Sequence, residues 1–453
     1  MTSSYLYLTT AIEGPLLVKH FVPCATHDTN DVPNPPQCHP GTRVAFLKDL
    51  SDWVKDTESS TRIIWLFGPA GAGKSAITHS VAEELSAAGN LAASFFFCRM
   101  DPRRNTDKPL LGTIVYQMAK SIPKLQPYIS KAILDDPMIS TKSLRTQFER
   151  LIVNPVMEVL ASHPPSKLSP ALIIIDGLDE CEDREGRRLI LDTIFHAIPR
   201  LVTSFKFLVS SRPEDDIRRI FERSNIREEI RFVELLSDYQ AYEDIRLYLR
   251  DGLSQLKRTH PIAEIIGSEW PPHESIEALV HKSSGHFIYA YSVLKYIDSH
   301  RYRPQDCLDT VLSLRATTPD NPYAELDAIY HDVLASSRAD RKRLSEVLAL
   351  SLVCIRADEH FAGLDLFIES LLALERGSVK LLLLDIGSVV SLRKSSWSTV
   401  HCPVWSIRFE HKSFVDFLLD ASRSGEFYVD LQHACMTAAK ACLKALNDRA
   451  YLT

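Results

Sequence analysis

The feature that most constrains the fold is the glycine-rich segment "GPAGAGKS" at residues 68–75, which directly follows the apolar run "RIIWLF". Three of its eight residues are glycine, although the whole chain of 453 residues has only 16 glycines. The apolar run predicts a buried strand, and "KSAITHSVAEELSAAG" has the spacing of a helix that ends at Gly89. Glycines between a strand and a helix let successive backbone N–H groups point inward, and the helix N-terminus adds positive potential. The segment therefore predicts an anion-binding loop.

The segment also fits the pattern G-x-x-x-x-G-K-[ST], in which Lys74 reaches the β and γ phosphates of a nucleotide and the Ser75 hydroxyl binds Mg²⁺. The alternative is an ordinary turn between a strand and a helix, but the pattern and its flanking elements favour a phosphate loop. The predicted nucleotide-binding residues of this loop are Gly68, Pro69, Ala70, Gly71, Ala72, Gly73, Lys74, Ser75 and Ala76.

A second motif, "LIIIDGLDEC" at residues 172–181, is an apolar strand that ends in Asp176. This aspartate would stand at the carboxyl edge of a sheet beside the glycine loop, where it and Ser75 are the predicted metal ligands. Asp179 and Glu180 follow within one turn and are predicted to orient or deprotonate an attacking water. Alone, "DGLDE" could be a simple acidic turn, and its pairing with the glycine loop favours the catalytic interpretation.

A third motif, "FKFLVSSRP" at residues 205–213, ends a further strand with Arg212. An arginine at this edge can bind a γ-phosphate through charge-assisted hydrogen bonds, which makes Arg212 a third candidate catalytic residue. The alternative is a surface arginine before a proline turn.

The order of elements predicts an α/β class. Apolar strands alternate with helices up to Leu236, which implies a parallel sheet covered by helices on both faces. Helices follow, and from Asp340 three helices, two short β-like pieces and one more helix have the outline of a winged-helix domain. The predicted domains are a lead-in (1–40), a P-loop domain (41–235), a helical domain (236–337), a winged-helix domain (338–430) and a C-terminal helix (431–453).

The order "GPAGAGKS", "LIIIDGLDE", "FLVSSRPE" resembles the NACHT group of STAND signal-transduction NTPases, in particular fungal members often labelled nephrocystin-like N-terminal P-loop domains. The lead-in "CHPGTRVAFLKDLSDW" and the strand "AASFFFCRMD" are also similar to theirs. The resemblance covers about residues 38–430.

The resemblance implies ATP or ADP with Mg²⁺ as ligands and a nucleotide-dependent switch with slow ATP hydrolysis. It also implies that Thr42 and Arg43 lie against the adenine, that Arg212 senses the γ-phosphate, and that His411 in "IRFEHKSFVDFL" touches the β-phosphate of ADP. The alternative for His411 is a partly buried histidine with ordinary hydrogen bonds. Kinship further implies protein partners, homo-oligomer formation on activation, and a role in fungal innate immunity, heterokaryon incompatibility or programmed cell death.

Composition restricts the partners and the compartment that we expect. The formal net charge of −6, from 52 basic and 58 acidic residues, gives no general reason to expect nucleic acid as a partner, and it leaves open a local basic face. Nine scattered cysteines without a Cys-x-x-Cys pair predict reduced thiols rather than zinc or disulfides. Without a signal-peptide pattern or a long apolar run, we expect a cytoplasmic protein with no membrane segment.

Two other functions remain open at this stage. One is a scaffold or adaptor with a vestigial nucleotide site, against which the intact Lys74, Ser75, Asp176 and Glu180 argue. The other is a P-loop kinase or ATPase with fast turnover, for which neither an acceptor pocket nor a basic lid is visible in the sequence.

Overall fold

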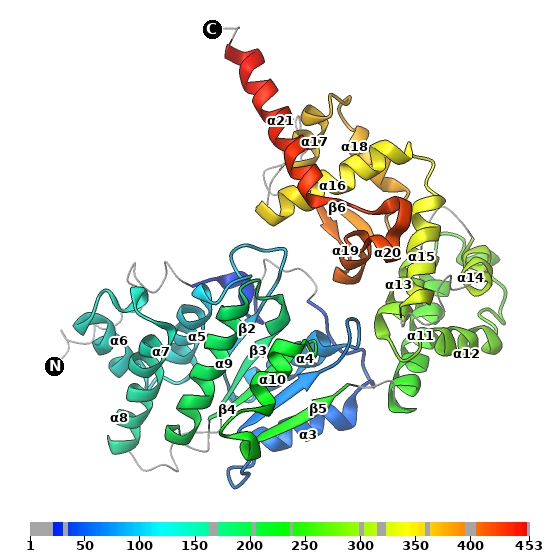
Figure 1. Cartoon of the computed structure of the whole chain (residues 1–453). Helices are drawn as coiled ribbons and strands as arrows, with labels where there is room; N and C mark the ends of the chain where they lie inside the picture. Colours follow the sequence, from blue (N-terminus) through cyan, green and yellow to red (C-terminus); the bar gives the residue numbers. More distant parts are fainter. Residues whose placement is uncertain are drawn as a thin grey trace. The chain divides into compact units, whose positions relative to one another are not determined.

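The computed structural model describes residues 21–29, 35–162, 171–201, 205–235, 239–298, 303–314, 323–357, 363–394 and 405–450. The chain divides into two compact units, Met1–Leu236 and Ser237–Thr453. The first unit contains a five-stranded sheet, and the second is mostly helical with a two-stranded hairpin (Figure 1).

The sheet of the first unit is entirely parallel, with the strand order β2-β3-β4-β1-β5. Its strands are β1 (Ile63–Phe67), β2 (Leu91–Phe96), β3 (Ala171–Asp176), β4 (Phe205–Ser211) and β5 (Ile230–Glu234). The first four are buried along their whole length, as expected for strands covered on both faces. The α/β class and the covered parallel sheet predicted from the sequence are therefore confirmed.

Alternate residues of each strand enter two different hydrophobic cores. Ile63, Trp65 and Phe67 face one core, whereas Ile64 and Leu66 face the other. This is the two-residue period of a strand, with apolar residues on both sides.

Each core is closed by its own set of helices. The core on the Trp65 side is covered by α5 (Lys108–Ser121), α6 (Gln126–Asp135), α7 (Leu144–Phe148), α8 (Asn154–Ser162), α9 (Arg184–Ala197) and α10 (Asp215–Glu222). The core on the other side is covered by α3 (Val44–Lys55) and α4 (Lys74–Ala87).

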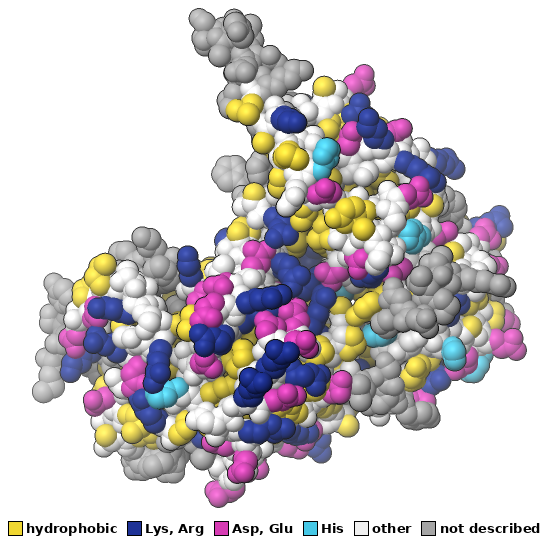
Figure 2. Space-filling view, viewed as in Figure 1, with side chains coloured by type: hydrophobic (Ala, Val, Ile, Leu, Met, Phe, Trp, Pro, Cys, Tyr) yellow, Lys and Arg dark blue, Asp and Glu magenta, His cyan; other side chains and the backbone are white. Residues whose placement is uncertain are grey.

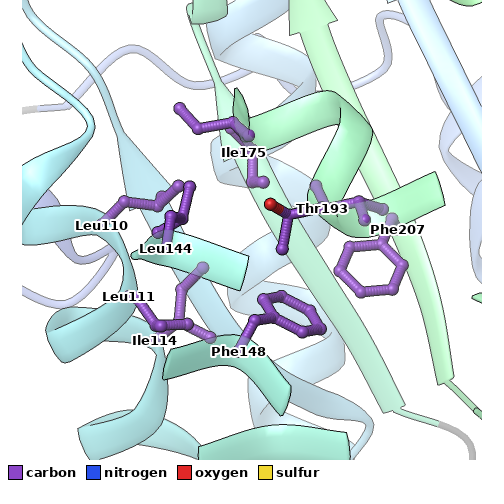
Figure 3. A pocket seen from close by; sticks show the side chains of 10 residues that line it. Leu110, Leu111, Ile114, Leu144, Phe148, Ile175, Thr193 and Phe207 are labelled. Carbon is purple, nitrogen blue, oxygen red and sulfur yellow. The ribbon is translucent and has the colours of Figure 1, made fainter. Parts of the chain in front are cut away.

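The core on the Trp65 side is closely packed. Figure 3 shows apolar side chains from α5, α7, β3 and β4, together with Thr193 of α9, around a cavity of about 10 Å³. Such a volume holds about one water molecule, so this region serves packing and has no room for a nucleotide.

Two helical details differ from the sequence-based prediction. In the helical pattern "SLRTQFERLIVNPVMEVLAS" the sequence predicts a kink at Pro155, whereas the structure has a π-helical turn at Glu149–Val153, which ends where α8 begins. A proline cannot donate its N–H and its ring crowds the preceding turn, and the wider turn absorbs both effects. Helix α6, in "QPYISKAILD", was not predicted at all.

Residues 21–29 pack against the edge strand β2. Their 3₁₀ turn at Pro23–Ala25 buries Cys24 and Ala25, and the His27 N–H donates to the Ser94 hydroxyl at 3.1 Å. This segment therefore lies against the edge strand, while side chains of α5 bond to the strand's backbone: Gln117 pairs with the N–H and carbonyl of Ser94, and Ser121 donates to the Ala92 carbonyl.

The second unit contains eleven α-helices in its described part. They are α11 (Tyr239–Thr259), α12 (His273–Lys282), α13 (Phe287–Ile297), α14 (Pro304–Ser313), α15 (Ala324–Ala335), α16 (Arg341–Ala357), α17 (Leu364–Leu371), α18 (Ser378–Leu384), α19 (Lys412–Leu418) and α20 (Ala421–Ser424), with α21 (Leu431–Ala450) at the C-terminal end as an eleventh. Strands β6 (Val390–Lys394) and β7 (Trp405–Phe409) pair antiparallel between α18 and α19. The order of three helices, a hairpin and a helix matches the elements on which the winged-helix prediction was based.

Two expectations from composition can be compared with the described residues. The seven cysteines whose side chains the structure describes form no disulfide with one another. No helix within it has both the length and the apolar character needed to cross a bilayer.

Candidate functional site

The glycine loop, residues 68–75, connects β1 to α4 at the carboxyl edge of the sheet. Gly71 and Gly73 have φ angles of 76° and 96°, which side chains other than glycine rarely adopt. Gly68 is required for a different reason, because a Cβ there would lie 2.9 Å from the backbone oxygen of Leu235 after β5. The loop conformation thus depends on glycine at each of these positions.

Lys74 is the first residue of α4, and its side chain folds back over the loop. Its Nζ donates to the carbonyl oxygens of Gly68 at 2.8 Å and Pro69 at 2.9 Å. The ammonium group therefore lies at the mouth of the loop, together with the positive end of the α4 dipole. Both features attract an anion to the same place.

Asp176, the last residue of β3, accepts hydrogen bonds from three hydroxyl groups. Ser75 Oγ donates to Oδ2 at 2.7 Å, Thr78 Oγ1 donates to Oδ1 at 2.8 Å, and Ser210 Oγ also donates to Oδ1. Burial raises the pKa of Asp176, although these three hydrogen bonds act in the opposite direction. The structure thus brings together Ser75 and Asp176, the two residues predicted to bind the metal.

Asp179 lies in the short 3₁₀ turn Leu178–Glu180 and is buried. Its carboxylate accepts from the Arg212 N–H at 3.0 Å and forms an ion pair with Arg212 Nε at 3.3 Å. Its backbone oxygen accepts from Arg187 and Arg99, at 2.7 Å and 2.9 Å. Two predicted catalytic residues therefore contact each other, and the Asp179 carboxylate holds Arg212 at the end of β4.

Glu180 is more exposed than Asp179 and turns toward the loop after β2. Its Oε2 accepts from the Arg99 N–H at 3.1 Å. Gly177, with a φ of 69°, permits the sharp change of direction between Asp176 and this turn. Of the two carboxylates predicted to act on water, Glu180 is therefore the one with greater access to solvent.

Thr42 and Arg43 lie at the N-terminus of α3, which packs beside α4 on the same face of the sheet. The Thr42 hydroxyl donates to the His39 carbonyl at 2.7 Å, so this hydroxyl stabilises the turn that precedes α3. Arg43 is 8% exposed and has a φ of 54°, an unusual conformation for a side chain of this size.

His411 lies in the second unit as the N-cap of α19. Its Nδ1 accepts from the Ser413 N–H at 2.9 Å and lies 2.8 Å from Ser413 Oγ, which in turn contacts the Tyr330 hydroxyl at 2.6 Å. Because Nδ1 is the acceptor of the cap, the neutral ring carries its proton on Nε2.

Several residues that shape the site could not be recognised in the sequence. Thr78 and Ser210 hold Asp176, and Arg99 contacts both Asp179 and Glu180. Serine, threonine and arginine are common, and only the fold brings these ones together. For Thr78, the sequence offers one indication of a role in the site: its hydroxyl lies one helical turn after Lys74, on the same face of the helix as Ser75.

Comparisons with known proteins agree on part of this assignment. A family model described as "Nephrocystin 3, N-terminal" matches residues 41–212. No curated protein matches the chain significantly.

Solved structures show a distant likeness. The ORC1 protein of Aeropyrum pernix, solved in complex with DNA, has 16% identity and a TM-score of 0.35, covering 86% of this chain and 95% of its own. Drosophila ORC, solved bound to DNA, has 13% identity and a TM-score of 0.33, covering 90% of each chain. At these TM-scores the likeness says nothing about ligands or partners.

The first unit thus has the motifs, the parallel sheet and the loop geometry of a P-loop NTPase. The family-model match covers the same region, from the lead-in to Arg212. The first unit has the α/β fold of a P-loop NTPase, and a mostly helical region follows it.

Proposed function

We propose that this protein is a signal-transduction NTPase of the NACHT type, which binds ATP or ADP and uses the bound nucleotide as a switch. The observation that carries the proposal is the contact of Ser75 with Asp176 beside the Lys74 ammonium group. Burying the Asp176 carboxylate carries a desolvation cost. A site that binds a metal cation needs a negative charge at this place, which accounts for that cost. In this proposal the backbone of residues 68–76 and Lys74 bind the phosphates, while Thr42 and Arg43 lie against the base.

The residues at this position suit Mg²⁺. A serine hydroxyl and a carboxylate are hard oxygen ligands, and Mg²⁺ in such sites is held by one or two protein groups and the phosphates. Ser75 and Asp176 would hold the ion, which when bound would neutralise charge on the phosphates. Thr78 and Ser210 orient the carboxylate through its Oδ1.

Glu180 is the residue that we propose to orient the attacking water, since the Asp179 carboxylate is occupied by Arg212. Arg212, held by Asp179, would donate to the γ-phosphate of ATP. Because ADP has no γ-phosphate, this arginine distinguishes the two nucleotides.

The switch requires groups that bind one nucleotide more tightly in one conformation than in another. We propose that the Nε2 proton of His411 is donated to the β-phosphate of ADP in an inactive form, and that ATP favours a form that assembles with further copies. A role in fungal innate immunity or programmed cell death is the corresponding biological proposal, and it depends on the family resemblance alone.

The charges visible on the surface give no support to a nucleic-acid partner. Figure 2 shows basic and acidic side chains interspersed on the face in view. Among exposed side chains, Arg188 pairs with Glu185 on α9, and Arg218 lies 3.9 Å from Glu222 on α10. A nucleic-acid surface would instead carry a stripe of basic residues.

The test is the affinity of the purified chain for ATP and ADP in Mg²⁺, measured by calorimetric titration for the parent and for Lys74→Ala. Loss of a buried charge-assisted contact to phosphate should weaken binding about 100-fold. Lys131→Ala, on the exposed side of α6, is the matched control and should bind as the parent does. Unchanged affinity in Lys74→Ala would favour a scaffold with a vestigial site, and fast multiple turnover without assembly would favour an ATPase or a kinase.

A further inference from the structure

The segment between β2 and α5, residues 97–107, forms a compact turn around one buried carboxylate. Asp101 is fully buried, and both of its oxygens accept hydrogen bonds from the guanidinium group of Arg103. Arg104 Nε donates to Oδ2 at 3.0 Å, and the Cys98 N–H donates to the Arg104 carbonyl at 3.2 Å. The turn is therefore closed upon itself and held by charge-assisted bonds.

The N-terminal segment binds to the same carboxylate. Cys24 Sγ donates to Asp101 Oδ2 at 3.4 Å, and Arg104 Nη1 donates to the Cys24 carbonyl at 3.0 Å. Burial raises the pKa of the Cys24 thiol to about 12, so that the group keeps its proton and acts as a donor. We call Asp101, with Cys24, Arg103 and Arg104, the Asp101 hub.

The other side of the turn reaches the candidate catalytic carboxylate. Arg99, two residues before Asp101, donates its N–H to Glu180 Oε2 at 3.1 Å. Its guanidinium group donates to the Asp179 carbonyl at 2.9 Å. The Glu182 N–H also donates to the Asn105 carbonyl at 2.8 Å, so the two turns are joined at both ends.

These contacts form a continuous path from residues 23–27 through Asp101 and Arg99 to Glu180. A general base works only within a narrow range of positions, and a displacement of about 1 Å can reduce a rate on the order of 100-fold. The position of Glu180 depends on the turn, and the turn depends on the hub.

We propose that Arg99 is a positioning residue for Glu180, and that the Asp101 hub makes this positioning depend on the docking of residues 23–27 against the sheet. The inference rests on the proposed function, in which Glu180 orients the attacking water. The N-terminal segment thereby gains control over hydrolysis without touching the nucleotide, since its contacts lie on β2, on the turn that follows it and on α5.

The first test compares Arg99→Ala with Arg99→Lys in the full chain. Single-turnover hydrolysis of Mg·ATP should be about tenfold slower in Arg99→Ala, while ATP affinity stays within about twofold of the parent. Arg99→Lys should recover part of the rate, because an ammonium group can still donate to the Asp179 carbonyl. Arg188→Ala, which removes an exposed ion pair on α9, is the control and should hydrolyse at the parent rate.

The second test addresses the hub. Cys24→Ala removes one donor to Asp101 and should slow ATP hydrolysis about threefold, with the affinity for ATP unchanged. Cys24→Ser keeps a donor and should hydrolyse ATP at the parent rate. Cys307→Ala, a buried cysteine in α14, is the matched control and should leave the rate unchanged.

The results distinguish this inference from the function on which it rests. A parent-like rate in folded Arg99→Ala, or an equal loss of rate and affinity, would overturn the positioning role. A parent that binds ATP and leaves it intact would also overturn it, but nucleotide binding would stand. A parent that binds no nucleotide would remove the proposed function together with this inference.

Discussion

Asp176 shows at the residue scale how the requirements of a site oppose stability. Burial raises the pKa of this carboxyl, which means that folding shifts its ionisation equilibrium toward the neutral form. A raised pKa makes the ionised group a cost at neutral pH, because folded protein binds the proton more tightly than unfolded protein does. Stability from this group therefore falls as the pH rises through the window above the ordinary pKa of an aspartate.

Asp176→Asn should consequently stabilise the ligand-free chain while weakening Mg²⁺-dependent binding. We expect the free energy of unfolding at pH 7 to rise by about 1 kcal/mol, measured by urea denaturation without nucleotide. The stabilisation that Mg·ATP gives the parent should be lost. Asp192→Asn, at an exposed position of α9, should change neither quantity. A less stable Asp176→Asn would show that the carboxylate is a structural group.

His79 on α4 is a buried histidine whose ring stacks on Phe96 at 3.8 Å. Its Nδ1 has no hydrogen-bond partner among the described residues. Burial, with smaller contributions from His27 and Arg104, lowers its pKa from 6.5 to about 3. The unfolded chain takes up a proton below pH about 6.5 and the folded chain does not, so folding stability is lost as the pH falls through this window.

The stability of the parent relative to His79→Phe should therefore fall in acid. From pH 7 to pH 5 we expect a relative loss of about 2 kcal/mol, since each pH unit below the unfolded pKa costs about 1.36 kcal/mol. Urea denaturation at pH 7, 6 and 5 measures this difference. His196→Gln, which changes an exposed histidine on α9, should keep the pH dependence of the parent. Parallel curves for the parent and His79→Phe would contradict the assignment.

How much of the site was predictable at this scale depends on the chemistry of each residue. Lys74, Ser75 and Asp176 occupy fixed places in motifs, because phosphate and metal binding require those groups at those spacings. Arg99 and Asp101 were missed, since their partners Glu180 and Cys24 are 81 and 77 residues away along the chain. No local sequence pattern indicates a contact between residues so far apart in the chain.

At the scale of elements, the conformation of the glycine loop depends on the chain after β5 as well as on the loop's own glycines. The close approach of Gly68 to Leu235 joins the loop to the chain after β5. Any side chain at residue 68 would push these two backbones apart, because a backbone oxygen cannot rotate away as a flexible side chain can.

Gly68→Ala should therefore destabilise the first unit by about 1–3 kcal/mol, the usual cost of overpacking. It should also weaken nucleotide binding, because the loop moves with β5. Gly267→Ala is the control, since a Cβ there meets nothing within 4 Å. Thermal unfolding and calorimetric titration of both variants measure the two effects. A Gly68→Ala variant with the stability and affinity of Gly267→Ala would contradict the packing argument.

The elements themselves were largely predictable, and the exceptions have physical reasons. Buried parallel strands such as Ile63–Phe67 are almost wholly apolar, which makes them easy to locate. Helix α6 was missed because it is short and begins beside prolines, with Ile129 and Ile133 as its main apolar signal. The π turn before Pro155 depends on packing that a helical pattern does not contain.

At the scale of the whole molecule, the proposed switch depends on a residue to which we assign two roles. His411 caps α19 through Nδ1, and the proposal assigns its Nε2 proton to the β-phosphate of ADP. His411→Ala removes both roles, so its effect alone would be ambiguous. Asparagine is a good N-cap residue, so His411→Asn keeps the cap and removes the imidazole.

Both variants should bind ADP about tenfold more weakly than the parent, if the contact contributes as one charge-assisted hydrogen bond. Only His411→Ala should lose stability in the second unit, by about 1 kcal/mol for a lost cap. ADP titration and thermal unfolding separate these effects, and size-exclusion mass reports whether weaker ADP binding favours assembly. Parent-like ADP affinity in His411→Asn would restrict His411 to capping.

In the proposed function, the first unit binds an adenine nucleotide through the glycine loop, Lys74 and Asp176. The most direct measurement is to denature the purified full-length chain and identify by chromatography the nucleotide that it releases, before and after incubation with Mg·ATP. We predict close to one molecule of ADP or ATP per chain in the parent, and a large loss in Lys74→Ala. A parent that releases no nucleotide even after this incubation would show that the first unit does not bind an adenine nucleotide.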